Sequence, residues 1–137
     1  MKYPEQIICR ALSATPAVAR HLGFRLYPMI VPTSAPLPFA VYQRNSVERQ
    51  QTLGLPPGIP KTDLSLNIYA ASYSQVREIA DACRQKLDHL DVTAQGVSVS
   101  NVTIEDESED IVQLEGGDLP PAWQVTFRLT IEWSEAD

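Results

Sequence analysis

The sequence lacks long apolar runs, since no stretch approaches the roughly 20 residues that a membrane-spanning helix requires. The opening segment, MKYPEQIICRALSATP, has only a short apolar patch that Arg10 interrupts, so we expect no signal peptide and no membrane partner. Cysteine is also scarce. Cys9 and Cys83 both fall on the apolar sides of predicted helices, which favours reduced core residues of a protein made in a cytoplasm. A disulfide between them is the less favoured alternative.

Motifs for catalysis are scarce as well. Neither GxxxxGK[ST] nor GxGxxG occurs, so no phosphate-cradling loop is indicated. The two histidines, His21 and His89, lie near the expected ends of helices, where an imidazole can interact with the helix dipole. A metal site needs closely spaced ligands, and the two cysteines lie on separate predicted helices. The sequence therefore predicts no enzyme activity, no catalytic residue, no metal site and no cofactor.

The charge of the chain is unevenly distributed. Residues 1–61 hold seven Lys or Arg and two Asp or Glu, whereas residues 62–137 hold four and fifteen, for a net charge of −6. This balance argues against general affinity for nucleic acid, whose phosphates need a basic face. It suits self-association if the two halves present separate faces, and the alternative is that the halves interleave in space. A length of 137 residues fits one domain covering residues 1–137.

Three helices are predicted. The first covers residues 4–14, and the third runs from about Ser74 to Leu90. The second begins at Thr15-Pro16, which is typical of a helix cap followed by a first-turn proline, and ends at Leu22. Ser72 with Gln75 forms a possible capping box for the third helix, and Ser74 is the competing cap.

Four strands are predicted, at residues 39–47, 61–70, 97–105 and 123–133. The last is the clearest, because six large apolar residues alternate with polar ones in WQVTFRLTIEW. A phase change at Ser100-Asn101 predicts a bulge in the third strand. The four prolines of residues 24–38 indicate extended edge structure or loop. The expected fold is α+β: a four-stranded, mostly antiparallel sheet with helices packed on one face.

A long connection at about residues 48–60 joins two predicted strands as a hairpin tip. Its segment TLGLPPGIP contains Leu53, Leu55 and Ile59, and its prolines stiffen it. The tip either folds back over its own sheet or forms an arm that grips a neighbouring subunit. In the second case these three residues, together with Arg44 and Arg49, are candidate subunit-interface residues.

An acidic segment, EDESEDIVQLEGGD, covers residues 105–118, and seven of these fourteen residues are Asp or Glu. It does not match the spacing of a calcium-binding EF-hand loop. The favoured interpretation is a solvated acidic loop between two strands. The functional alternative is a negative surface past which DNA slides without sticking, with lumen-facing candidates Glu105, Asp106, Glu107, Glu109 and Asp110.

Several structural motifs stand in a familiar order. Tyr27-Pro28 and the segment PLPFAVY (36–42) precede Ile68-Tyr69-Ala70, after which Ser72-Tyr73 opens a helix. This arrangement resembles the phage tail-completion or tail-terminator family, small proteins of the neck region of long-tailed bacteriophages and prophages. The resemblance covers about residues 5–90 well and the remainder loosely. The acidic segment is not a hallmark of that family.

The resemblance implies a structural virion protein of the tail or neck, assembled in the cytoplasm of the host cell. Such proteins form a ring, commonly a hexamer, on the end of the tail tube. The ring stops tube growth, contacts the tail tube protein and a head-completion or connector protein, and lets DNA pass through its centre without specific binding. Neither an activity nor a cofactor comes with the resemblance. The alternatives are a head-completion adaptor on the portal side and a small ligand-binding module that uses the acidic loop.

Overall fold

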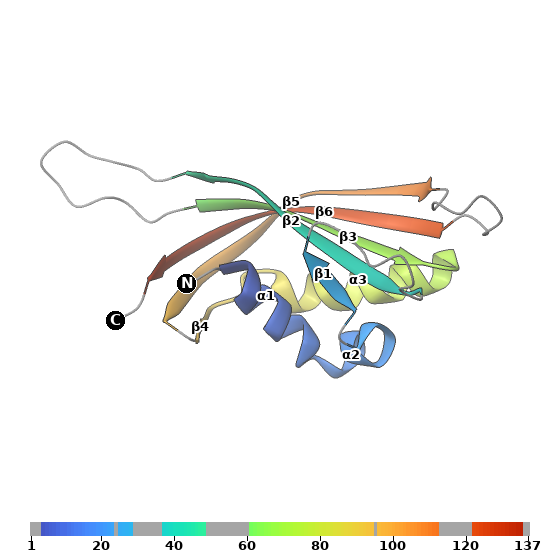
Figure 1. Ribbon diagram of the computed structural model, residues 1–137, viewed down its shortest axis with the longest axis horizontal. Helices are drawn as coiled ribbons and strands as arrows, with labels where there is room; N and C mark the ends of the chain where they lie inside the picture. The colour runs from blue at the N-terminus through green and yellow to red at the C-terminus, as the bar shows by residue number, and fades with distance from the viewer. Residues whose placement is uncertain are drawn as a thin grey trace, which may run out of the picture.

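The computed structural model describes residues 4–23, 25–28, 37–48, 61–94, 96–112 and 122–135. These residues contain three helices and six strands (Figure 1). The helices are α1 (Pro4–Ser13), α2 (Pro16–Leu22) and α3 (Tyr73–Leu87). The strands are β1 (Leu26–Pro28), β2 (Phe39–Glu48), β3 (Lys61–Ala70), β4 (Val92–Ala94), β5 (Val97–Val112) and β6 (Ala122–Glu135).

All six strands form one sheet in the order β1-β2-β3-β6-β5-β4. The β1–β2 pair is parallel and the other four pairs are antiparallel. The sheet is strongly twisted, and the three helices lie on one of its faces (Figure 1). The α+β class, the mostly antiparallel pairing and the one-sided helix layer are confirmed. The prediction of four strands is wrong, because β1 and β4 have only three residues each and are too short to show an alternating pattern.

The core lies between the central strands and the helix layer. On β3, Leu64, Leu66 and Ile68 face the helices, and on β6 the alternating residues do the same; Phe127 and Leu129 are fully buried. The helices supply a complementary apolar face, with the buried residues Ile8, Leu12, Val18, Leu22, Val76, Ile79, Ala80, Cys83 and Leu87. Burial of each large apolar side chain contributes roughly 1.5–3 kcal/mol, so this layer contact is the main source of stability.

The ends of α3 are determined by local hydrogen bonds. The Ser72 hydroxyl oxygen accepts a hydrogen bond from the Gln75 amide at 3.2 Å, so Ser72 is the cap and Ser74 is not. The helix ends at Leu87 and not at Leu90, because Asp88 is extended and His89 has a φ of +59°. The His89 amide then donates to the Val102 carbonyl of β5 at 3.0 Å, which turns the chain toward the sheet.

Two predicted details of the polar residues are corrected. Thr15 stands at the N-cap position of α2, but its hydroxyl donates to the Ala11 carbonyl at 2.8 Å and makes no capping bond. The disulfide alternative is wrong, since Cys9 and Cys83 both carry free thiols.

Strand β5 is longer than predicted. The expected bulge is confirmed, because the register with β6 shifts between Val99 and Asn101, and a second shift follows between Ile104 and Asp106. The strand then continues to Val112, so residues 105–112 are strand and not loop. Charged residues on an exposed strand show no hydrophobic alternation, which is why the sequence pattern missed this part. Residues 113–118 of the predicted loop lie outside the described residues.

Candidate functional site

The outer side of β5 is an open sheet edge. Strand β4 pairs only with Val97–Val99, so from Asn101 to Val112 this side of β5 has no strand partner in the described part of the chain. Residues 105–111 are all exposed. A strand edge presents unpaired N–H and C=O groups and is a template for pairing with another chain. This edge is therefore the first candidate for a surface through which the protein assembles.

The register of β5 against β6 divides its acidic residues between the two faces of the sheet. Glu107 lies opposite Phe127 and Glu109 lies opposite Val125, and both of these β6 residues are buried beneath the helices. Because directly paired residues share a face, Glu107 and Glu109 point to the helix side.

Asp106 and Asp110 have the opposite orientation. They pair with Arg128 and Gln124, whose side chains lie on the helix-free face of the sheet. Glu105 lies at the second register shift and lines two surface depressions, one with Lys61 and Arg128 and one with Arg84 and Asp88, so it lies at the edge between the two faces. The five predicted lumen-facing residues thus lie on one strand but do not form one surface.

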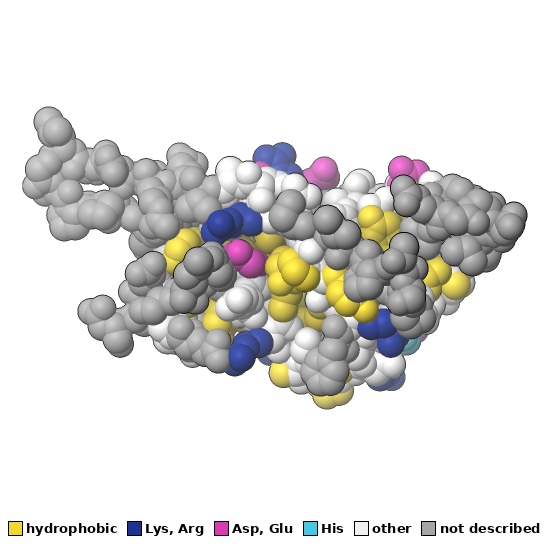
Figure 2. Space-filling model, in the orientation of Figure 1, with side chains coloured by type: hydrophobic (Ala, Val, Ile, Leu, Met, Phe, Trp, Pro, Cys, Tyr) yellow, Lys and Arg dark blue, Asp and Glu magenta, His cyan; other side chains and the backbone are white. Residues whose placement is uncertain are grey.

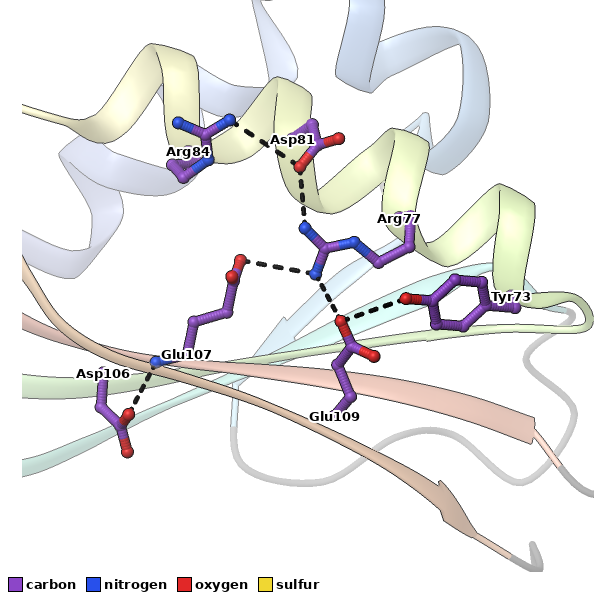
Figure 3. A network of polar contacts seen from close by, with 7 residues as sticks. All are labelled: Tyr73, Arg77, Asp81, Arg84, Asp106, Glu107 and Glu109. Carbon is purple, nitrogen blue, oxygen red and sulfur yellow. Dashed lines mark hydrogen bonds and ion pairs between the residues drawn. The ribbon is translucent and has the colours of Figure 1, made fainter.

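The helix-facing carboxylates are held by an arginine of α3 (Figure 3). Nη1 of Arg77 lies 2.9 Å from Oε1 of Glu109 and 3.6 Å from Oε1 of Glu107. Nη2 of the same guanidinium lies 2.9 Å from Oδ1 of Asp81, one helical turn away. The Tyr73 hydroxyl donates to the same Glu109 oxygen at 3.5 Å. These polar contacts therefore connect the acidic half of β5 to the first half of α3.

The pKa shifts of Arg77 and Tyr73 are consistent with these contacts. Partial burial lowers the pKa of Arg77, but the carboxylates of Glu107, Asp81 and Glu109 outweigh it and raise that pKa above its ordinary value. The hydrogen bond to Glu109 raises the pKa of Tyr73. The sequence pattern did not identify this cluster. The i,i+4 spacing of Arg77 and Asp81 indicates one of its ion pairs. The contacts of Arg77 with Glu107 and Glu109 have no local signal, because β5 and α3 come together only through the tertiary fold.

Apolar side chains adjoin the cluster at the far end of β5. Ile111 lies opposite Trp123 of β6, and the Tyr73 ring packs edge-on against Trp123 with centroids 5.3 Å apart. Ile111 and Tyr73 are the large apolar side chains that are exposed among the described residues, at 51% and 46%. On the face seen in Figure 2, hydrophobic side chains occur in several separate groups between polar and charged ones.

Of the predicted subunit-interface residues, Arg44 is the one that lies within the described part of the chain. Arg44 pairs with Leu64 and so lies on the helix side of β2, where its Nη1 is 4.0 Å from Oε1 of Glu5. Its side chain is 40% exposed. The structure does not bring Arg44 near the acidic strand, because β2 and β5 lie on opposite sides of the β3–β6 centre. Arg49, Leu53, Leu55 and Ile59 lie outside the described residues.

Charge is segregated between the two halves of the sheet. No Asp or Glu occurs between Glu5 and Glu48, and no Lys or Arg occurs between Lys86 and Arg128. The first segment includes β1 and nearly all of β2, and the second includes β4 and the whole of β5. The strand order puts these pairs at opposite edges. Within the sheet, the strands of the two sequence halves therefore lie at separate edges, whereas in the helix layer the halves meet, since Arg20 of α2 pairs with Glu78 of α3 at 2.9 Å.

The described residues show no assembled centre for chemistry. They contain no group of three or more His, Cys, Asp or Glu placed to hold a metal ion. Burial raises the pKa of the Cys9 and Cys83 thiols to about 12, so neither thiol is activated as a nucleophile at neutral pH. None of the helices in this part of the chain is long and apolar enough to span a bilayer. Glu107 and Glu109 are engaged with Arg77, which speaks against a ligand-binding role for these two carboxylates.

The described residues thus define a helix-backed α+β protein whose sheet has an acidic edge strand. Residues 6–132 match the model of the family "Tail completion protein gp17", so the match extends through the C-terminal strands. The chain belongs to this family, and membership identifies it as a structural protein of the tail of a phage-type virion.

A solved structure has the same fold. The chain is similar to a chain of the "Virion of native gene transfer agent (GTA) particle", with a TM-score of 0.65 and 16% sequence identity over 91% of each chain. At this identity the likeness concerns the fold alone. Comparison with curated proteins found no match.

Proposed function

We propose that this protein forms a closed ring on the end of the tail tube, where it stops tube growth and joins the tail to the head-completion proteins. One observation supports the ring in particular: the two edges of the sheet differ in charge. A closed ring of identical subunits needs heterologous contacts, in which a patch on one copy meets a different patch on the next. The β5 edge is strongly acidic, whereas β1 and β2 carry only Arg44 and Glu48, so contacts between unlike edges avoid the repulsion that two β5 edges would meet.

Assembly on purified tail tubes tests this proposal. We expect a discrete oligomer by native mass spectrometry and a cap on the tube end by electron microscopy, with six copies as the family resemblance implies. A protein that stays monomeric even with tubes present would contradict the proposal. A monomer in isolation would not contradict it, since some rings assemble only on their template.

A head-completion adaptor on the portal side is the second candidate, which the sequence resemblance leaves open. Binding of the protein to purified tail tube and, separately, to purified connector distinguishes the two. Binding to the tube end supports the terminator. Binding to the connector alone supports the adaptor.

Within the ring, we place Glu105, Asp106 and Asp110 toward the lumen. Asp106 and Asp110 lie on the helix-free face. Carboxylates on that face would repel DNA phosphates, so DNA would pass through the ring without binding to it. Glu107 and Glu109 serve the Arg77 contact instead. The combined change Glu105→Gln, Asp106→Asn, Asp110→Asn should increase retention of DNA by the assembled ring at low salt. Asp91→Asn, an exposed carboxylate next to β4, is the control and should leave retention unchanged.

The hairpin tip is proposed as an arm that grips the neighbouring subunit. Deletion of residues 53–59, which carry Leu53, Leu55 and Ile59, should weaken assembly while the monomer stays folded. A Gly/Ser replacement of the same length keeps the connection and removes the apolar side chains, so it should weaken assembly to a similar degree. Unchanged oligomerisation in both variants would refute the arm. Arg49→Ala tests the remaining interface candidate by the same measurement.

A further inference from the structure

We infer that adjacent copies join edge to edge, with β5 of one copy pairing antiparallel to β2 of the next, so that the sheet continues across the subunit boundary. This inference rests on the proposed ring and names the two surfaces that meet in it. The occupant of the open β5 edge is thus a second copy of this chain.

Both strands have an open edge in the described part of the chain. The outer side of β5 lacks a strand partner from Asn101 to Val112. On the other side of the sheet, β1 pairs only with residues 40–42 of β2, so residues 43–48 of β2 have no outer strand partner among the described residues. On β5 the Val102 carbonyl already accepts from the His89 amide, and the amides of Glu107 and Ile111 donate to the carboxylates of Asp106 and Asp110 at 2.9 and 2.8 Å. The remaining outward N–H and C=O groups of the two strands are available for pairing in the described part of the chain.

The directions of the strands fit this junction. Three successive antiparallel pairs lead from β2 through β3 and β6 to β5, so β5 runs opposite to β2. A rotation about an axis along the strands, as in a ring, preserves strand direction in every copy. The β5 edge of one copy then meets the β2 edge of the next in antiparallel orientation, the better of the two pairing modes.

Charge selects this partner over the alternatives. Two β5 edges would bring the five carboxylates of residues 105–110 against five others, and like charges directly opposite each other destabilise a strand pair. The edge formed by β1 and β2 has only two charged residues, Arg44 and, at the end of β2, Glu48, so it lacks the dense negative charge of β5. Arg44 lies on the helix side of β2, and Glu107 and Glu109 lie on the helix side of β5. Across the junction Arg44 therefore lies on the same face as the two glutamates, while it also lies 4.0 Å from Glu5 and both glutamates contact Arg77.

Cross-linking between single-cysteine additions tests the junction. Ser46 lies opposite Asp63, and Ser108 and Thr103 lie opposite Thr126 and Thr130, so all three side chains are on the helix-free face. One batch of protein carries Ser46→Cys on β2. The other carries Ser108→Cys or Thr103→Cys, which sample the two halves of the open β5 edge.

The batches are mixed, assembled on tail tubes and treated with a short bis-maleimide. The unsubstituted chain measures the background from Cys9 and Cys83, whose raised pKa values keep it low. Thr130→Cys is the matched control, because Thr130 lies on the same face but on β6, between Asp63 of β3 and Thr103 of β5.

A covalent dimer should form from Ser46→Cys mixed with one of the two β5 variants, and not from any variant alone or from Ser46→Cys mixed with Thr130→Cys. A chain that carries both productive cysteines should give a ladder up to the full ring. Dimers of Ser108→Cys alone would mean that β5 pairs with β5 and would overturn the inference. Rings that assemble without either cross-link would overturn the junction and leave the ring intact. Failure of the unsubstituted chain to assemble on tubes would overturn both.

Discussion

The Arg77 guanidinium lies 2.9 Å from a carboxylate oxygen of Glu109, a residue 32 positions further along the chain. This contact joins the first half of α3 to the part of β5 that has no outer strand partner in the described residues. An edge strand with unpaired backbone groups on one side is prone to fraying, so a charged contact with the helix layer helps to keep it in position.

Arg77→Met should lower the free energy of unfolding by about 1 kcal/mol, the value for a partly exposed charge network after discounting for solvent screening. Three carboxylates, those of Asp81, Glu107 and Glu109, would then lie close together without the guanidinium between them. Urea unfolding at low and high salt measures the effect, which should shrink at high salt.

Arg84→Met is the control for this change. Arg84 lies on the same helix but is 47% exposed, and its closest carboxylate oxygen, on Asp81, is 3.9 Å away. Its loss should cost less than about 0.5 kcal/mol. Equal losses for the two variants would mean that the contact between α3 and β5 does not stabilise the fold.

Ser72→Ala should destabilise the protein by about 1 kcal/mol, because the amide of Gln75 loses its hydrogen-bond acceptor at the start of α3. Ser74→Ala is the matched control. Ser74 lies inside the first turn, where Ala is a good helix former, so this variant should be neutral or slightly stabilising. Thermal unfolding of both variants checks the assignment, and a larger loss for Ser74→Ala would reverse it.

The elements that the sequence predicts correctly are those whose side chains face the core. The alternation around Phe127 identifies β6, and the spacing of Val76, Ile79 and Cys83 identifies the buried face of α3. Burial imposes a period on these residues, and the period can be read without the structure. Even the bulge near Asn101 is visible, since it interrupts that period.

The candidate site was less predictable for the same reason. The carboxylates of β5 lie at an exposed edge, where no core imposes a pattern, so a strand there looks like a loop. The pairing of Glu109 with Arg77 depends on the second register shift, after Ile104, and on the position of α3 across the sheet. The spacing of residues in the sequence encodes neither the register shift nor the position of α3. The sequence therefore identifies the acidic residues but not which face of the sheet each one lies on.

Phe127→Ala should cost roughly 3–5 kcal/mol of unfolding free energy, since the ring is fully buried between the sheet and the helices. Ile111→Ala, a comparable truncation at a position that is 51% exposed, should change stability by less than about 1 kcal/mol. Chemical denaturation of both variants gives the comparison. Similar losses would show that the helix-facing side of β6 is not the core.

Alkaline pH should destabilise the protein through its buried thiols. Burial raises the pKa of Cys83 from 9.0 to about 12, so the unfolded state loses the thiol proton at a lower pH than the folded state does. The stabilising contribution of the neutral thiol is therefore complete below pH 9.0 and is lost as the pH rises toward about 12. Within that window each such thiol should lower the free energy of unfolding by about 1.4 kcal/mol per pH unit.

Urea unfolding at about pH 8 and about pH 10.5 measures this loss, and Cys83→Ala isolates the thiol. The variant has its own packing cost at both pH values, so the informative quantity is the change in stability between them. That change should be smaller in Cys83→Ala than in the unsubstituted chain. Cys83→Val, which also lacks an ionisable group, should show the same reduced change. If the two variants lost as much stability as the unsubstituted chain, ionisation of Cys83 would not be coupled to unfolding, and its burial between α3 and the sheet would be in doubt.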